Sequence, residues 1–191
     1  MELQKLNVKF FVEQPNSIPL TDFIEIFHGW IQATDGVYHD VADYSHMQAG
    51  PGIVLIANDA HVSIDESGNR RGLVFSQKAQ LAGSNQTKLR AVLRAALENC
   101  RKLEAEPALG GKLRFAANEA VISLNDRLLG VNSEESFEAI KGDVESLATQ
   151  LFGGGEFSLA RDTDARQRLN IHVKTSASVG VAQALENLSR N

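Results

Sequence analysis

The segment YHDVADYSH, residues 38–46, places two histidines, two aspartates and two tyrosines within nine residues. Imidazole and carboxylate groups are common general acids and bases, and together they also suit zinc, manganese or iron. Chain segments at strand ends frequently carry such functional groups. We therefore take Asp43, Tyr44 and His46 as candidate catalytic residues, because they form the densest local cluster and precede a Gly-Pro-Gly turn.

Four of the five histidines, at positions 28, 39, 46 and 61, lie in a part of the chain that is rich in carboxylates. Neighbouring carboxylates stabilise a protonated imidazole or orient a neutral one toward a metal ion. His28, His46 and His61 are therefore candidate metal ligands. Spacing alone does not make a site, since Asp40 and His46 would lie roughly 20 Å apart along a straight strand. A strand with a polar rim is the simpler interpretation of this segment, and the identity of any cofactor stays open.

Charge is divided into two blocks along the chain. From Glu13 to Glu66 there are nine acidic residues and no lysine or arginine, whereas Arg70 to Lys102 holds eight basic residues against Glu98 alone. These blocks carry −9 and +7 in a chain whose net charge is −5. Such segregation of charge creates an electrostatic field that steers charged partners. Exposed charge pairs fix the orientation of a complex more than they add to its affinity. We expect the blocks to face each other, within one molecule or across a homodimer.

The basic block also supplies a candidate binding face, made by Arg70, Arg71, Arg90 and Arg94. Guanidinium groups in this number suit an acidic protein partner or a phosphate group. The acidic total and the scarcity of aromatic side chains near this block argue against nucleic acid. The alternative is that these arginines only keep a helix surface in water.

The apolar pattern predicts an α+β fold. Apolar residues favour a strand over residues 6–12 and recur at helical spacing over residues 23–31, 89–103 and 137–151. A further hairpin is predicted for residues 157–173. Hairpins imply antiparallel pairing, and helices with one apolar stripe must cover a sheet face. The sequence therefore predicts a largely antiparallel sheet with three packed helices.

An internal repeat relates GIVLIANDAHVSIDES, residues 52–67, to GKLRFAANEAVISLNDR, residues 111–127. Both contain glycine, alternating apolar residues, Asn-Asp-Ala or Asn-Glu-Ala, and then serine between apolar residues. Each copy predicts two strands around a tight polar turn, followed by a short strand and a helix. The repeat would therefore span residues 52–105 and 111–152 and give two related hairpin-plus-helix halves.

Length and composition bound the class of protein. The 191 residues suit one domain, predicted over residues 1–174, with a loose tail or marginal helix over residues 175–191. The single cysteine, Cys100, excludes an internal disulfide and suits a reducing compartment. Residues 1–12 lack a signal-peptide pattern, and no window reaches the about 20 apolar residues of a membrane span. We expect a cytoplasmic protein without a membrane partner.

Several segments resemble those of uncharacterised bacterial proteins of similar length: HGWIQ, ADYSHMQAGPGIVL, GNRRGLVFSQK, LRAALENCRKLE and NDRLLGVN. The resemblance spans about residues 6–174 and implies a stand-alone bacterial domain. It carries over no activity and no catalytic residue.

Three functions follow from these observations. The sequence has no Walker loop, dinucleotide fingerprint, HExxH, CxxC or GxSxG motif. The leading hypothesis is therefore a non-catalytic cytoplasmic binding or assembly module that self-associates. One alternative is a small metal-binding protein or acid/base enzyme that uses the histidine- and aspartate-rich first third. The other is phosphate or nucleic-acid binding through residues 70–102.

Overall fold

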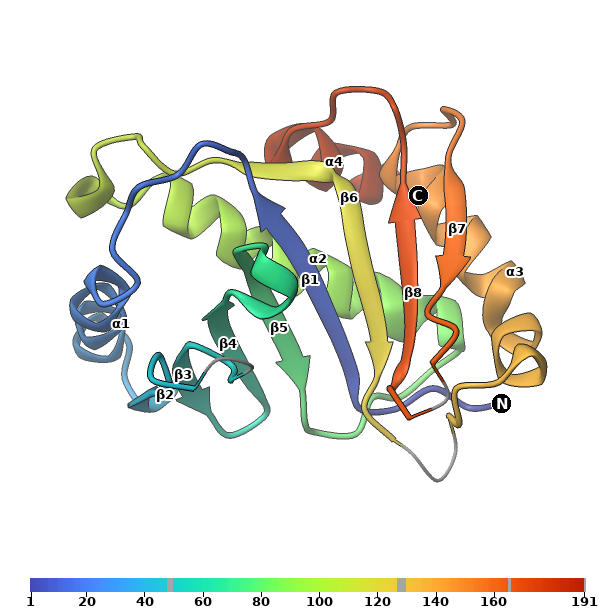
Figure 1. Cartoon of the computed structure of the whole chain (residues 1–191), viewed down its shortest axis with the longest axis horizontal. Helices are drawn as coiled ribbons and strands as arrows, with labels where there is room; N and C mark the ends of the chain where they lie inside the picture. The colour runs from blue at the N-terminus through green and yellow to red at the C-terminus, as the bar shows by residue number, and fades with distance from the viewer. Residues whose placement is uncertain (48–49, 127–129, 165, 191) are drawn as a thin grey trace.

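The computed structural model describes residues 1–47, 50–126, 130–164 and 166–190, and its centre is an eight-stranded sheet (Figure 1). The strands, in chain order, are β1 (Leu6–Val12), β2 (Tyr38–Asp43), β3 (Ile53–Ala57), β4 (Ala60–Asp65), β5 (Gly72–Gln77), β6 (Phe115–Leu124), β7 (Ser158–Arg161) and β8 (Leu169–Lys174). The helices are α1 (Asp22–Ala33), α2 (Asn85–Glu104), α3 (Glu134–Leu151) and α4 (Val181–Ser189), with short 3-10 turns η1 (Ser67–Asn69) and η2 (Pro107–Leu109).

The strand order is β2-β3-β4-β5-β1-β6-β8-β7, and every neighbouring pair is antiparallel. The predicted α+β class with a largely antiparallel sheet is therefore confirmed. Helix α2 packs across β1, β5 and β6, while α3 and α4 pack against α2. Helix α1 packs on β2 and β3 at one end of the sheet. Four helices are present in the described residues, one more than the apolar pattern predicts.

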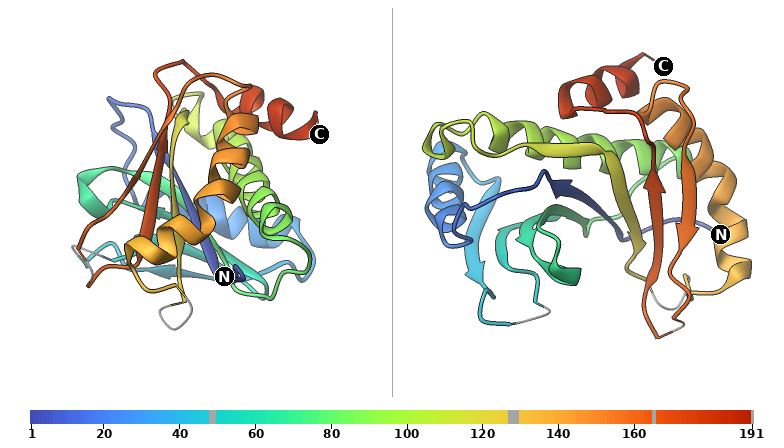
Figure 2. Two further views of the ribbon diagram at one scale, coloured as in Figure 1. Left: turned by 90° about the vertical axis from the view of Figure 1, so that its right-hand side faces the viewer. Right: turned by 45° about the horizontal axis from the view of Figure 1, so that its top comes forward.

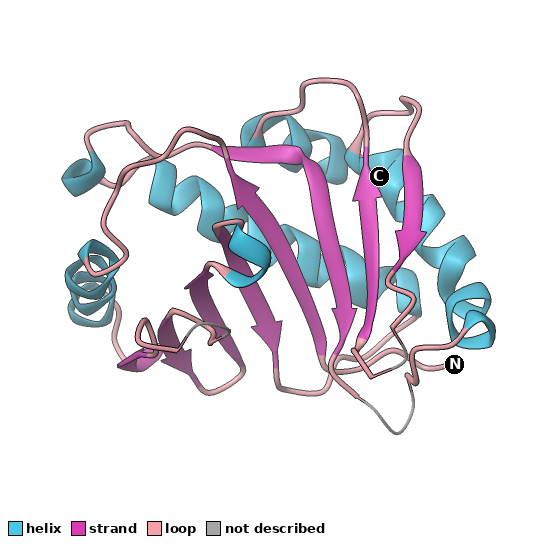
Figure 3. Ribbon diagram, in the orientation of Figure 1, coloured by secondary structure: helices cyan, strands magenta, loops and turns pink. Residues whose placement is uncertain are grey.

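The helices gather on one side of the sheet, as a view from its edge shows (Figure 2). Among the described helical segments, only η1 lies in front of the central strands β1 and β5 (Figure 3). Alternation along β1 explains the two faces, because Leu6, Val8 and Phe10 enter the core whereas Asn7 and Lys9 point the other way. The sheet therefore has one face covered by helices and one face that is open except where η1 lies over β1 and β5.

A row of polar side chains crosses the open face of the sheet. The strand register aligns, in order, His61, Ser76, Asn7, Ser123 and Asn170. Each belongs to a different strand, and each alternates with a core residue. This composition explains why the face can remain in contact with water.

The two copies of the repeat fold differently. The first forms the predicted hairpin of β3 and β4, whereas the second is part of the continuous strand β6. Phe10 pairs with Ala120 but Phe11 pairs with Ala116, so residues 117–119 form an irregularity in β6. The strand bends there instead of turning back, because both of its segments pair with β1 (Figure 1). The predicted hairpin over residues 111–127 is therefore wrong, and the second part of the repeat is a strand followed by a helix instead of a hairpin followed by a helix.

The segments that follow the repeat also differ from expectation. A strand was expected over residues 128–131, but 128 and 129 lie outside the described residues, and Gly130 and Val131 are not in a strand. The cap of α3 is Ser133, whose hydroxyl accepts a hydrogen bond from the Ser136 N–H at 3.2 Å. The helix therefore begins after a serine side-chain cap.

The C-terminal segment is packed. Helix α4 buries Val181, Ala184, Leu185 and Leu188, which recur at helical spacing and face α2 and α3. Of the two alternatives expected for residues 175–191, a loose tail or a marginal helix, the structure has a helix over Val181–Ser189, and this helix is packed. Its apolar stripe is short, and surrounding polar residues dilute the pattern in the sequence.

A half-buried carboxyl near the end of α2 gives a pH-dependent prediction. Glu104 accepts a hydrogen bond from the Phe115 N–H at 2.7 Å. Burial, assisted by the nearby Glu13 carboxylate, raises the pKa of Glu104 above 4.5, although the Phe115 N–H and Arg114 act in the opposite direction. The folded state therefore binds the proton of the Glu104 carboxyl more tightly than the unfolded chain does. Ionisation of Glu104 lowers the free energy of unfolding at neutral pH, and this loss becomes smaller as the pH falls.

Glu104→Gln keeps the acceptor oxygen and removes the charge. We expect the variant to have a higher Tm than the wild type at pH 7, and the difference to shrink at pH 5. Scanning calorimetry at the two pH values measures both quantities. A lower Tm at pH 7, or a difference that does not change with pH, would contradict the prediction.

Candidate functional site

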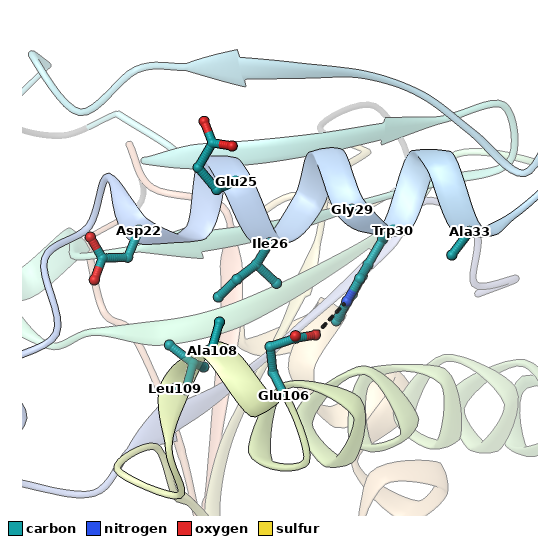
Figure 4. A pocket seen from close by; sticks show the side chains of 9 residues that line it. All are labelled: Asp22, Glu25, Ile26, Gly29, Trp30, Ala33, Glu106, Ala108 and Leu109. Atoms are coloured by element: carbon teal, nitrogen blue, oxygen red, sulfur yellow. Dashed lines mark hydrogen bonds between the residues drawn. The ribbon is translucent and has the colours of Figure 1, made fainter.

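A groove of about 550 Å³ lies between α1 and η2 (Figure 4). Helix α1 lines one wall with Asp22, Glu25, Ile26, Gly29, Trp30 and Ala33. The other wall consists of Glu106, Ala108 and Leu109. The α1 residues recur every three or four positions, so they belong to one face of the helix. The groove therefore runs along α1.

The sequence of α1 explains how this wall is held. Phe23, Ile26, Phe27 and Trp30 are buried and fix the helix to the rest of the molecule. Asp22 and Glu25 lie in the first turn, where a carboxylate interacts favourably with the positive end of the helix dipole. The acidic end of the groove therefore coincides with a position that the helix itself favours for acidic residues.

Trp30 joins the two walls of the groove. Its Nε1–H donates a hydrogen bond to Oε2 of Glu106 at 3.1 Å, as the dashed line in Figure 4 shows. The Nζ atom of Lys102 stands 3.7 Å from the indole centroid, and Phe27 packs at 5.4 Å. Burial lowers the pKa of Lys102, while Glu106 opposes this effect. Trp30 is only 4% exposed, so its indole forms a fixed floor of the groove.

The chemistry of the groove is that of a cation-binding surface. Its lining residues include three carboxylates, from Asp22, Glu25 and Glu106, and no lysine, arginine or histidine. They also include no serine, threonine or cysteine that could act as a nucleophile. Apolar side chains of Ile26 and Leu109 separate the carboxylates. A ligand with a positive charge and an apolar stem would therefore complement this surface.

The chain matches no protein family, no curated protein and no solved structure. Among the described residues, no helix is both long enough and apolar enough to span a membrane.

The candidate catalytic residues lie outside the groove. Asp43 is the last residue of β2, while Tyr44 and His46 belong to the exposed turn that follows. The carboxylate of Asp43 accepts a hydrogen bond from the Ser45 N–H at 2.8 Å. Hydrogen bonds from Ser45 lower the pKa of Asp43. This carboxylate therefore stabilises a turn, which accounts for an aspartate at this position without any catalytic role.

The candidate metal ligands lie on three separate elements. His28 is on the exposed side of α1, His46 follows β2, and His61 is on the open face of β4. Across the described residues, no three histidine, cysteine, aspartate or glutamate side chains could hold one metal ion. Burial and then Lys78 lower the pKa of His61. The metal-binding interpretation therefore has no supporting geometry in this part of the chain.

All four arginines of the predicted basic face are engaged within the chain. The hydrogen-bonded pairs are Arg70 with Glu119, Arg71 with Glu66, Arg90 with Gln150 and Arg94 with Glu98. Arg70 also stacks 3.7 Å above the Phe11 ring. Because some of their donors already have partners within the chain, these side chains offer less to a phosphate or an acidic protein than their number suggests.

The acidic block has few partners of its own. Among ion pairs between described residues, that of Glu66 with Arg71 alone connects the acidic block to the basic block. Asp65 pairs with Lys9, which belongs to neither block. The other acidic residues of the block form no ion pair in the described structure: Glu13, Asp22, Glu25, Asp35, Asp40, Asp43 and Asp59. Several of them lie on α1 and β2, so this end of the sheet is acidic.

Proposed function

We propose that this chain is a non-catalytic, cytoplasmic binding module, and that its groove holds a cationic group of a partner. One observation supports this most directly: three carboxylates line the groove and no basic side chain does. Charge-assisted hydrogen bonds between carboxylates and ammonium or guanidinium groups are about twice as strong as neutral ones.

The surroundings of the groove favour the same type of partner. Unpaired carboxylates on α1 and β2 create a negative potential at this end of the sheet. Such a field accelerates association with a basic partner and repels an acidic one. A lysine or arginine side chain would place its alkyl stem against Ile26 and Leu109 and its charged end near Glu106.

Self-association is a second candidate, because one face of the sheet is open and a second copy could cover it. The polar row on that face and the aspartates on the edge strand β2 oppose it, since both favour water over another chain. Sedimentation velocity at low and high salt measures the oligomeric state. A dimer at both salt concentrations would support this second candidate.

The groove is tested by neutralising its carboxylates. We expect Asp22→Asn with Glu25→Gln to weaken binding of a flexible glycine–lysine peptide by about tenfold, since each exposed ion pair contributes up to about 1 kcal/mol. The protein has a single tryptophan, Trp30, so its fluorescence reports binding in the groove directly.

Asp40→Asn with Asp43→Asn is the matched control, because it removes the same charge from β2, outside the groove. We expect the control to change the affinity less than about twofold. Equal losses in the two double variants would mean general attraction between charges and would contradict the proposed groove. Failure of the wild-type protein to bind the peptide would contradict it as well.

A further inference from the structure

The shape of the groove carries an inference that rests on the proposed function and extends it. The lining residues of α1 run from Asp22 to Ala33, which corresponds to three turns and about 16 Å of helix. Five of the nine lining residues are exposed: Asp22, Glu25, Gly29, Ala33 and Ala108. The groove is therefore long and shallow. A small ligand needs most of its surface buried, typically about 70–90%, and this site would leave it largely in water.

The groove allows another backbone to approach closely. Its lining residues include Gly29, Ala33 and Ala108, which are the smallest residue types. A Cβ atom built on Gly29 meets nothing within 4 Å, so the space beside this residue is empty. Helices pack with their axes about 8–10 Å apart, and small residues at the contact permit the shorter distances.

We infer that the groove is a docking site for an amphipathic helix of a partner protein, with lysine or arginine beside small or apolar residues. Such a helix would lie along α1, with its small residues over Gly29 and Ala33. Its basic residues would reach Asp22 at one end of the groove and Glu106 on the opposite wall, while Glu25 points away from that wall and would attract them from the outer side of α1 (Figure 4). Recognition of this kind depends on side chains that recur at positions i, i+3, i+4 and i+7.

The inference is tested with three synthetic probes and Trp30 fluorescence. The first is an amidated peptide of about 15 residues, with lysine, leucine and alanine along one helical face and with alanine and glutamine at the other positions. The second differs only by two central prolines, which break the helix. The third is the flexible glycine–lysine peptide. We expect the helical peptide to bind at least about tenfold more tightly than the proline version, with a gain in helical circular dichroism on binding.

A pair of glycine variants tests the place of docking. Gly29→Gln puts a side chain into the groove. Gly142→Gln adds the same side chain on α3, outside the groove, where a Cβ atom also meets nothing within 4 Å. Both changes replace a glycine inside a helix by a better helix former, so both variants are expected to fold. We expect Gly29→Gln to weaken helical-peptide binding about tenfold or more, and Gly142→Gln to change it less than about twofold.

Equal affinities for the helical and proline peptides would overturn the inference, as would an unchanged affinity in Gly29→Gln. If the flexible peptide still binds and responds to Asp22→Asn with Glu25→Gln, the proposed cationic site survives without the helix. If spermine binds as tightly as the helical peptide, the occupant is a small polyamine and the inference fails. If no probe binds, the inference and the proposed function fail together.

Discussion

Replacing Asp65 by alanine is expected to lower the free energy of unfolding by about 3–5 kcal/mol. Its carboxylate forms an ion pair with Lys9, and the two side chains are only 12% and 11% exposed. Without the carboxylate, the ammonium would keep hydrogen bonds to the carbonyl oxygens of Ser67 and Arg70, at 3.3 and 2.8 Å. These neutral acceptors do not balance a charge held away from water. Urea denaturation followed by circular dichroism measures the loss.

Two controls separate this effect from the loss of any acidic residue. Asp164→Ala removes an ion pair with Arg166 in which the side chains are 40% and 89% exposed, so we expect little change in stability. The double variant Lys9→Met with Asp65→Leu removes both charges and should recover most of the loss. If Asp65→Ala destabilised the protein no more than Asp164→Ala, the importance of the buried pair would be contradicted.

Trp30→Ala is expected to lower the free energy of unfolding by a similar amount, about 3–5 kcal/mol. The indole is 4% exposed and contacts Phe27, Tyr38 and Lys102. Its removal would leave a cavity between α1 and α2 and would free Glu106 from its hydrogen bond. Urea denaturation followed by circular dichroism measures the change, since this variant has no tryptophan fluorescence.

Trp30→Phe refines this prediction. Phenylalanine keeps most of the apolar surface but lacks the N–H donor, so we expect a smaller loss than for alanine. Tyr44→Ala is the control, since Tyr44 is 40% exposed and its loss leaves no cavity. A loss for Trp30→Ala no larger than that for Tyr44→Ala would show that the indole does not hold α1 in place.

The elements with strong periodicity could be predicted from the sequence. The apolar stripe of α2, which includes Leu89, Leu93 and Leu97, is buried along its whole length. The apolar residues of segment 6–12 identified β1, and the hairpin predicted for residues 157–173 corresponds to β7 and β8. The fold of the second copy of the repeat could not be predicted from its own pattern, because this fold depends on pairing with β1. Both halves of β6 pair with that strand, so the segment bends and does not fold back.

The groove could not be predicted from the sequence either. Trp30 and Glu106 are 76 residues apart, and only the packing of α1 beside η2 brings them together. The conspicuous YHDVADYSH segment instead forms an edge strand and an exposed turn, in which Asp43 satisfies a local N–H group. Clusters that are dense in sequence can reflect local turn chemistry, whereas sites built between elements leave no local signature.

The central position of β1 has a consequence for biosynthesis. Its neighbours in the sheet are β5 and β6, and β6 ends at Leu124, whereas β1 ends at Val12. At about 5–20 residues per second, a ribosome needs roughly 6–22 s to add the residues between them. Until Gln77 has been added the nascent β1 strand lacks both of its partners, and from then until Leu124 it lacks β6. The yield of folded protein should therefore depend on elongation rate and on chaperones that shield apolar strands, because this pairing joins distant parts of the chain.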